Sequence, residues 1–422
     1  MKKYFYIFIL IVLINSGGGI YFEMYRNPLT IFLFLLFLIY LFLNKKVYFL
    51  KAYIIIFLLF IVLLFINYQF AIKGQIINPY GYFVLTALIA LLANTTLSRT
   101  EFLDSFIKAL NFYKYHALLT YLAFFIIKDH LVYFEFGEDK HYYTFFYIFF
   151  STLGNNLREF YSITYLRNNG LFWEPGILQI FMNILLFIQL FLVKSTKFQK
   201  LSTIFVVITT FSTTGLVLLT FTLIVKYLST LTFSRFIKTL PIILVFLLSF
   251  LPVLLYNVEE KVSGEKADSA QVRFFDALQS LIIISDYPAT GIGLTLKPYT
   301  ELQKQFYGTA FGVYSPNPEG NTNSILNTLV FLGIPFGLIL LYALYKQNIF
   351  YNKKYLFFLI IIISLMSEPL LLRPFFMFIV FNGFLYIFLD FFKVPLQKKR
   401  RVTHSLTFKK TTNSTIKGKT NV

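Results

Sequence analysis

Long apolar segments dominate the sequence, and most approach the length that crosses a lipid bilayer. A helix of about 20 apolar residues spans a hydrocarbon core of roughly 30 Å. Only 14% of the residues are charged, against about 25% in soluble proteins, so a water-soluble globule is excluded. We predict an all-α integral membrane protein with about 12 transmembrane helices and two long external loops that are partly helical. The predicted spans are 4–20, 29–44, 47–67, 79–95, 113–130, 175–193, 201–212, 214–229, 239–256, 324–345, 355–368 and 373–392.

The prediction of two separate spans at 201–212 and 214–229 rests on the charges that flank them. Lysines such as Lys194 and Lys226 lie beyond both ends of the pair, and the polar run 212–215 lies between the two spans. Basic residues at both ends favour a hairpin that returns to the cytoplasm. A single long helix through both segments is the alternative.

Two further boundaries follow from local sequence. The segment 355–392 is divided where Glu368 precedes Pro369, because a charge and a helix breaker coincide there. Residues 96–112 have apolar residues at helical spacing and charges elsewhere on the helix. They predict a separate helix in the cytoplasmic interface.

The net charge of +19, from 38 Lys and Arg against 19 Asp and Glu, is explained by topology. With both termini cytoplasmic, most Lys and Arg fall on cytoplasmic segments, as the positive-inside rule requires. We therefore predict a multi-pass membrane protein with both termini cytoplasmic and no nucleic-acid partner. The basic run Lys2-Lys3 and the apolar residues after it resemble a signal peptide. The many later spans favour a retained first span instead.

The predicted organisation has six parts. The C-terminal tail is basic and rich in Thr, Ser and Asn, which predicts a disordered segment in contact with anionic membrane lipid. The parts are 1–130 with the N-terminal spans, 131–174 as the first external loop, 175–256 with further spans, 257–323 as the second external loop, 324–392 with the C-terminal spans and 393–422 as the cytoplasmic tail.

The first external loop ends in a dense polar segment, 167–176, that runs directly into a span. Pro175 fits the first turn of that helix, so Glu174 lies at the positive end of the helix, where a carboxylate is favoured. In the alternative reading, Glu174 only complements the helix dipole and Arg167 is a solvated loop cation. The other candidates in this segment are Arg167, Asn168, Asn169, Gly170 and Trp173, the only tryptophan.

The second external loop contains a predicted helix at about 270–285. Arg273 lies on its polar face, and an Arg273–Asp276 surface pair is the alternative reading. The following Gly291 and Gly293 are too few and too isolated for a nucleotide-binding fingerprint, and they favour a tight turn or a close backbone approach. Asn323 lies at the end of the loop, before the next span.

Residue types needed for other chemistry are missing or scattered. The chain has no Cys, its four His are far apart in sequence, and no Asp-x-Asp pair occurs. We therefore predict no metal and no cofactor. Any phosphorylated substrate would then be bound by arginines, whose planar guanidinium suits phosphate oxygens.

These motifs, in this order, resemble the bacterial O-antigen ligase and polymerase superfamily over roughly 130–345. The resemblance rests on Arg167-x-x-Gly170-x-Phe172-x-Glu174-Pro175-Gly176, on Ser212-Thr213-Thr214-Gly215, on Arg273 followed by Pro288-x-Thr290-Gly291-x-Gly293, and on Asn323 followed by Gly333.

The resemblance implies a location in the bacterial inner (cytoplasmic) membrane and an undecaprenyl-pyrophosphate-linked oligosaccharide as substrate, bound at the external leaflet. An acceptor hydroxyl would attack the reducing-end sugar while the lipid pyrophosphate leaves. Arg167 and Arg273 are the candidates for stabilising the departing phosphates, and Glu174 is the candidate general base. A chain-length regulator is a further candidate partner. The candidate substrate-binding residues are Asn168, Asn169, Gly170, Trp173, Gly291, Gly293 and Asn323.

One departure from the family pattern favours a polymerase over a ligase. Ligases of this superfamily typically carry a His beside the Asn that precedes the late span, whereas this chain has Thr322-Asn323 and no His in the second loop. The leading hypothesis is a polymerase of polysaccharide repeat units. The alternatives are a ligase that transfers glycan to lipid A core and a flippase for the lipid-linked sugar. Few charges lie inside the predicted spans, which disfavours a transporter. A structural scaffold would leave the long loops unexplained.

Overall fold

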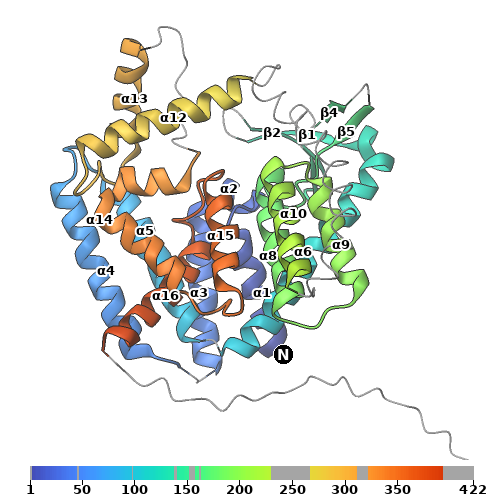
Figure 1. Ribbon diagram of the computed structural model, residues 1–422, viewed down its shortest axis with the longest axis horizontal. Coiled ribbons are helices and arrows are strands. Elements are labelled where there is room, and N and C mark those ends of the chain that lie inside the picture. The colour runs from blue at the N-terminus through green and yellow to red at the C-terminus, as the bar shows by residue number, and fades with distance from the viewer. Residues whose placement is uncertain are drawn as a thin grey trace, which may run out of the picture.

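The computed structural model describes residues 2–44, 47–96, 98–136, 140–151, 157–160, 163–229, 267–310 and 322–392, and most of them are helical (Figure 1). The helices are α1 Lys2–Asn15, α2 Ile20–Met24, α3 Arg26–Asn44, α4 Leu50–Phe70, α5 Ile77–Thr95, α6 Arg99–Ile127, η1 Lys128–His130, α8 Pro175–Phe191, α9 Lys197–Thr209, α10 Thr213–Leu228, α12 Ala267–Asp286, α13 Leu296–Ala310, α14 Ser324–Lys346, α15 Lys354–Leu365 and α16 Pro374–Phe391. The strands are β1 Val132–Phe136, β2 Lys140–Phe145, β3 Phe149–Ser151, β4 Leu157–Phe160 and β5 Ile163–Leu166.

Five helices in the described part of the chain are long and apolar enough to cross a membrane: α3, α4, α5, α14 and α16. The helices α8, α10 and α15 are apolar but shorter. These findings support a mostly helical membrane protein, and the predicted total of 12 spans is not confirmed. The predicted span 239–256 and the tail 393–422 lie outside the described residues.

The predicted hairpin in the middle of the chain is confirmed as two helices, α9 and α10. Phe211 between them has a positive φ of 46°, which ends α9. Ser212 then caps α10, because its side chain accepts a hydrogen bond from the Gly215 amide at 3.3 Å. The predicted break near Glu368 is also present, between α15 and α16, and Pro374 occupies the first turn of α16.

The prediction of a separate interfacial helix at 96–112 is wrong. A single helix of 29 residues, α6, continues through the expected boundary, because no Gly or Pro interrupts residues 99–127. The residues Phe102, Phe106, Leu110, Tyr113 and Ala117 are buried along one side of it. They form one continuous stripe at helical spacing, so the helix packs as a unit.

The all-α prediction is wrong for the first long loop, which contains β-structure. The strands β1, β2 and β3 form an antiparallel sheet, and β4 pairs with β5. Tyr133 lies directly opposite Tyr143, with ring centroids 5.4 Å apart. Aromatic and β-branched residues fit a pleated surface, and cross-strand aromatic pairs stabilise it. The described part of the second long loop contains the predicted helix, as α12, and additionally α13.

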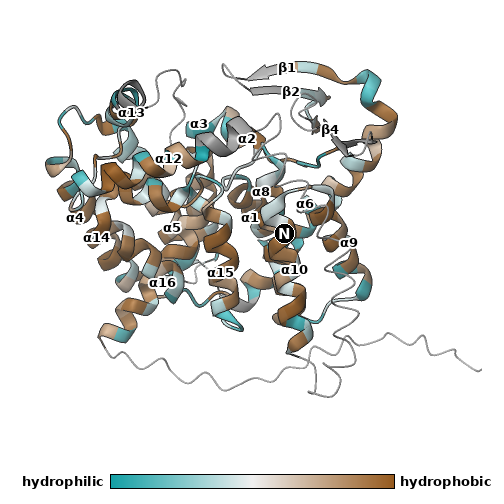
Figure 2. Ribbon diagram, turned by 45° about the horizontal axis from the view of Figure 1, so that its top comes forward, coloured by the Kyte–Doolittle hydropathy of each residue, from teal (hydrophilic) through white to brown (hydrophobic). Residues whose placement is uncertain are grey.

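The buried core lies around α16, which packs against α14, α5 and α4. Phe60, at the centre of this contact, has the rings of Phe83, Phe336 and Phe381 within 5.5 Å, centroid to centroid. Apolar residues follow the helices of this bundle, while β1–β5, α12 and α13 gather at one end of it (Figures 1 and 2). We call this end, with the turn 366–373 between α15 and α16, the loop end.

Candidate functional site

The polar segment before α8 is fixed to α6 and to the turn between α9 and α10. The Arg167 Nε donates to the Thr210 carbonyl at 3.2 Å. The Asn168 side-chain amide donates to the Ala117 carbonyl at 3.0 Å and to the Thr209 hydroxyl at 3.1 Å. These bonds hold Arg167 at the loop end, close to the α9–α10 turn.

Asn169 and Gly170 shape the same segment from within. The Asn169 side chain donates to the Phe172 carbonyl at 2.8 Å. Gly170 has a φ of +54°, and a Cβ there would lie only 3.2 Å from the Ala117 Cβ, so a glycine is favoured on both counts. The donors of Asn168 and Asn169 are thus used to fix the loop, and their role in substrate binding stays a prediction.

The N-terminal part of the chain pairs directly with this segment. The Ile20 amide donates to the Leu171 carbonyl at 2.9 Å, and the Trp173 amide donates to the Gly18 carbonyl at 3.3 Å. This short bridge brings α2, with Glu23, to the loop end. The sequence assigned only apolar spans to the N-terminal part, so this contribution was missed.

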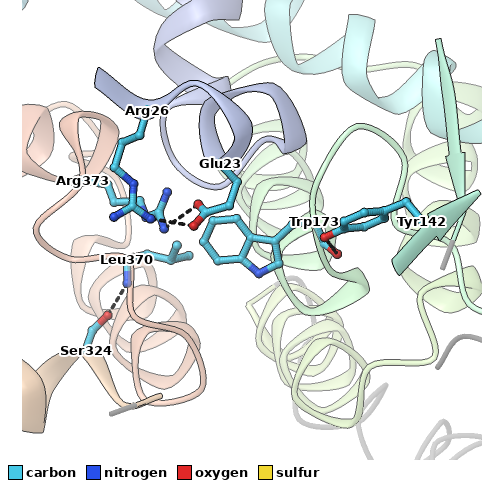
Figure 3. Close-up of polar contacts among 7 residues, drawn as sticks. All are labelled: Glu23, Arg26, Tyr142, Trp173, Ser324, Leu370 and Arg373. Atoms are coloured by element: carbon cyan, nitrogen blue, oxygen red, sulfur yellow. Dashed lines mark hydrogen bonds and ion pairs between the residues drawn. The ribbon is translucent and has the colours of Figure 1, made fainter. Parts of the chain in front are cut away.

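A largely buried arginine, Arg373, joins α2 to the Trp173 loop (Figure 3). Its guanidinium is 2.9 Å from the Glu23 carboxylate and 4.3 Å above the Trp173 ring. Arg26 binds the other Glu23 oxygen at 2.6 Å, and the Tyr142 hydroxyl donates to the Trp173 carbonyl at 3.4 Å. The side chains of Arg373 and Glu23 are only 11% and 13% exposed. The ion pair is thus largely removed from water, which makes each partner dependent on the other.

Glu368 is buried beside this cluster and is held from two sides. Its carbonyl accepts a hydrogen bond from the Ser324 hydroxyl, which itself accepts from the Leu370 and Leu371 amides at 2.5 and 3.1 Å. Figure 3 shows the Ser324–Leu370 bond. A Cβ on Gly176 would overlap the Glu368 Oε1. The glycine therefore lets the carboxyl reach the first turn of α8.

Four charged groups from three separate segments act on the Glu368 carboxyl. Burial raises its pKa well above the ordinary value, and the Glu174 carboxylate raises it further, whereas Arg273, Arg167 and Arg373 lower it. The fold therefore places Arg167 and Arg273, from different long loops, within electrostatic reach of one carboxyl group. Glu174 is exposed at the N-cap of α8, and its side chain makes no capping hydrogen bond.

Arg273 and Asp276 lie on α12 and face different surroundings. Arg273 is exposed, whereas Asp276 is only 1% exposed. Burial raises the pKa of Asp276 to about 6, although the Thr322 amide, which donates to it, and the Arg273 guanidinium both lower it. The carboxyl of Asp276 thus links α12 to the segment just before α14.

This burial predicts a pH-dependent stability. Because the folded-state pKa of Asp276 is about 6, above an unfolded value near 3.9, folding takes up a proton and stability falls as pH rises through about 4 to 6. Asp276→Asn keeps an oxygen that accepts from Thr322 and has no charge to bury. We expect it to be more stable than the wild type at pH 7.5, by up to about 3 kcal/mol, and equally stable at pH 4.

Thermal melting of the purified protein in detergent, measured from pH 4 to pH 8, checks this difference. Asp286→Asn is the matched control, because Asp286 is exposed at the other end of α12. A melting temperature of Asp276→Asn equal to that of the wild type at every pH would contradict the prediction.

Gly291 and Gly293 pack against a break in α14, where Gly333 is non-helical with φ 77°. The Ile292 amide donates to the Val330 carbonyl at 2.9 Å, and a Cβ on Gly291 would lie 2.6 Å from the Gly333 nitrogen. The predicted close backbone approach is therefore confirmed. Their role as substrate-binding residues stays a prediction.

Asn323 is the N-cap of α14. Its side-chain oxygen accepts from the Ile325 and Leu326 amides at 2.9 and 3.2 Å, which satisfies two free amides of the first turn. The neighbouring Ser324 holds the turn that carries Glu368. Asn323 thus fixes the start of α14 at the loop end. Its contact with substrate stays a prediction.

Sequence reasoning missed four charged residues of this region. Glu368 was used only to mark a break between spans, and Arg373, Glu23 and Arg26 were not singled out. The available signal was their position, since charges next to an apolar span need a structural or functional reason. Apart from the neighbouring pair Glu23 and Arg26, their partners come from distant parts of the chain, which no local pattern reveals.

A comparison with known families gives one match. Residues 200–342 match the family model described as O-antigen ligase. No curated protein and no solved structure matches the chain. The matched range includes Arg273, Gly291, Gly293 and Asn323 and leaves out Arg167 and Glu174.

Proposed function

We propose that this protein polymerises lipid-linked oligosaccharide repeat units, an activity of the O-antigen ligase and polymerase superfamily; the match of residues 200–342 to the O-antigen ligase family model supports the proposal. The predicted resemblance to this superfamily is confirmed by the match, which does not distinguish polymerase from ligase. The proposed reaction transfers glycan from undecaprenyl pyrophosphate to an acceptor repeat unit. The loop end would then face the external side of the bacterial cytoplasmic membrane, with both termini on the opposite side.

The observation that carries this proposal is that three arginines lie within electrostatic reach of one buried carboxyl group. Arg167, Arg273 and Arg373 all act on the Glu368 carboxyl, although they come from three separate segments. Preorganised cations stabilise charge that develops in a transition state, and a guanidinium binds phosphate oxygens through two parallel hydrogen bonds. In the proposed reaction, the arginines would stabilise the negative charge on the leaving pyrophosphate.

We assign distinct roles to the three arginines. Arg373 is largely buried and committed to Glu23 and Trp173, so it supplies a fixed positive field. Arg273 is exposed on α12 and Arg167 is partly exposed, so these two can contact the phosphates directly. This division keeps Arg167 and Arg273 as the proposed catalytic cations.

Purified protein in lipid nanodiscs, given carrier-linked repeat units, tests the activity. A polymerase yields a ladder of chain lengths that grows with time, together with released undecaprenyl pyrophosphate. A single transfer product, formed only when lipid A core is added, would instead identify a ligase. Movement of the carrier across vesicle membranes without elongation would identify a flippase and would contradict both transferase activities.

A further inference from the structure

The position of Glu368 bears on a step that the proposed polymerisation leaves open, the deprotonation of the acceptor hydroxyl. We infer that Glu368, rather than Glu174, is the carboxylate that accepts this proton. The inference rests on the proposed function and deepens it, because it names the base for the same site. It follows from where the two carboxyl groups lie.

Glu368 is held by the fold at both its backbone and its carboxyl. Its backbone is fixed through the Ser324 hydroxyl, which bonds three backbone groups of the turn 368–371. Its carboxyl lies over Gly176, where any Cβ would overlap it. A base has to be held within hydrogen-bond reach of the proton that it takes, and this double restraint limits where the carboxyl can be.

Groups around Glu368 act on its carboxyl in opposite directions, and their net effect raises its pKa. The first turn of α8 offers the positive end of a helix dipole, and Arg167, Arg273 and Arg373 favour the charged form. Burial and the facing Glu174 carboxylate act in the opposite direction and raise the pKa. In its ionised form, a carboxylate with a raised pKa is a stronger base than one in water, and the three arginines stabilise that ionised form.

Glu174 differs in each of these respects. It is exposed, and its side chain makes no hydrogen bond to the helix that it precedes. Water solvates such a carboxylate and competes for its lone pairs. Glu174 therefore contributes mainly a negative charge that acts on Glu368.

The step balances with groups already named. The acceptor hydroxyl oxygen forms a bond to the anomeric carbon of the donor, and the bond from that carbon to the pyrophosphate oxygen breaks. The leaving pyrophosphate keeps the electron pair and is stabilised by the arginines. The hydroxyl proton passes to a Glu368 oxygen and is later released to water.

Azide separates the two halves of this chemistry, because it attacks the anomeric carbon without a proton to lose. The full chain in nanodiscs is given the carrier-linked donor with either the hydroxyl acceptor or azide. Release of undecaprenyl pyrophosphate is measured in both cases. Glu368→Gln is expected to slow transfer to the hydroxyl by about 10²–10⁴-fold, while azide releases the carrier at least as fast as in the wild type.

Gly176→Ala is a second variant, because its Cβ displaces the Glu368 carboxyl without removing it, and the same selective loss is expected. Glu301→Gln, on the exposed face of α13, is the matched control and should keep both reactions. Arg273→Ala should lose both.

Three results would overturn the inference. Normal hydroxyl transfer by Glu368→Gln would show that another group takes the proton. Loss of both reactions in Glu368→Gln would assign it to positioning the arginines instead. Selective loss in Glu174→Gln would return the role to Glu174. A wild type that releases no carrier in either reaction would instead refute the proposed function, and with it this inference.

Discussion

Replacing Arg167 or Arg273 with Ala is expected to abolish the chain-length ladder. Each arginine acts on the Glu368 carboxyl, and in the proposed reaction each would also stabilise the leaving pyrophosphate. Removing one preorganised donor from such a site typically costs about 10²–10³-fold in rate. Lysine at either position should restore little, because a point charge cannot form two parallel bonds to phosphate. Initial rates of carrier release and gel analysis of the product measure the effect.

The double variant helps to separate catalysis from folding. Residues that act as a unit are non-additive, so Arg167→Ala with Arg273→Ala should be scarcely slower than either single variant. Lys304→Ala, an exposed cation on α13, serves as the control and should elongate normally. Membrane insertion and melting temperature are compared for all variants. Near-normal elongation by both single Ala variants would refute the proposed roles.

Replacing Gly383 with Ala is expected to prevent stable folding. Gly383 lies where α16 crosses α14, and a Cβ there would overlap the Ala343 carbonyl and lie 2.5 Å from its carbon. The obstacle is helix backbone, which cannot rotate away as a side chain can. Overpacking commonly costs about 1–3 kcal/mol, and this contact lies at the upper end because two helices must separate. We expect a large loss of folded protein after extraction.

Gly81→Ala is the matched control for this substitution. Gly81 also lies in a helix, α5, but nothing lies within 4 Å of its Cβ position. Ala there should be neutral or stabilising by about 0.5–1 kcal/mol. Size-exclusion profiles and melting temperatures of both variants measure the difference. If Gly383→Ala were extracted and melted like Gly81→Ala, the close crossing of α14 and α16 would be wrong.

Local sequence was sufficient to predict the positions of most of the helices. Apolar runs located α3, α4, α5, α8, α14 and α16, and flanking lysines with a polar turn separated α9 from α10. The stripe on residues 270–285 located α12. These features depend on neighbours within a few turns, so the pattern along the chain carries them.

The same reasoning failed where the deciding contacts are distant. The strands β1–β5 lie in the first long loop, to which the hydropathy pattern assigns no strand. The boundary expected near residue 112 is absent, because the apolar stripe of α6 continues to pack through it. In both cases packing decided the structure that local hydropathy left open.

For the candidate site, the sequence by itself determined which residue types are available: arginines in two long loops, a carboxylate at the start of α8 and glycines where backbones meet. Only the tertiary structure brought Arg167, Arg273 and Arg373 to act on Glu368, and only it paired Arg373 with Glu23. The physical reason is the distance along the chain over which the deciding interactions act. Helix formation and membrane partitioning are governed by residues close together in the chain, whereas the charges that would stabilise a leaving group meet only after folding.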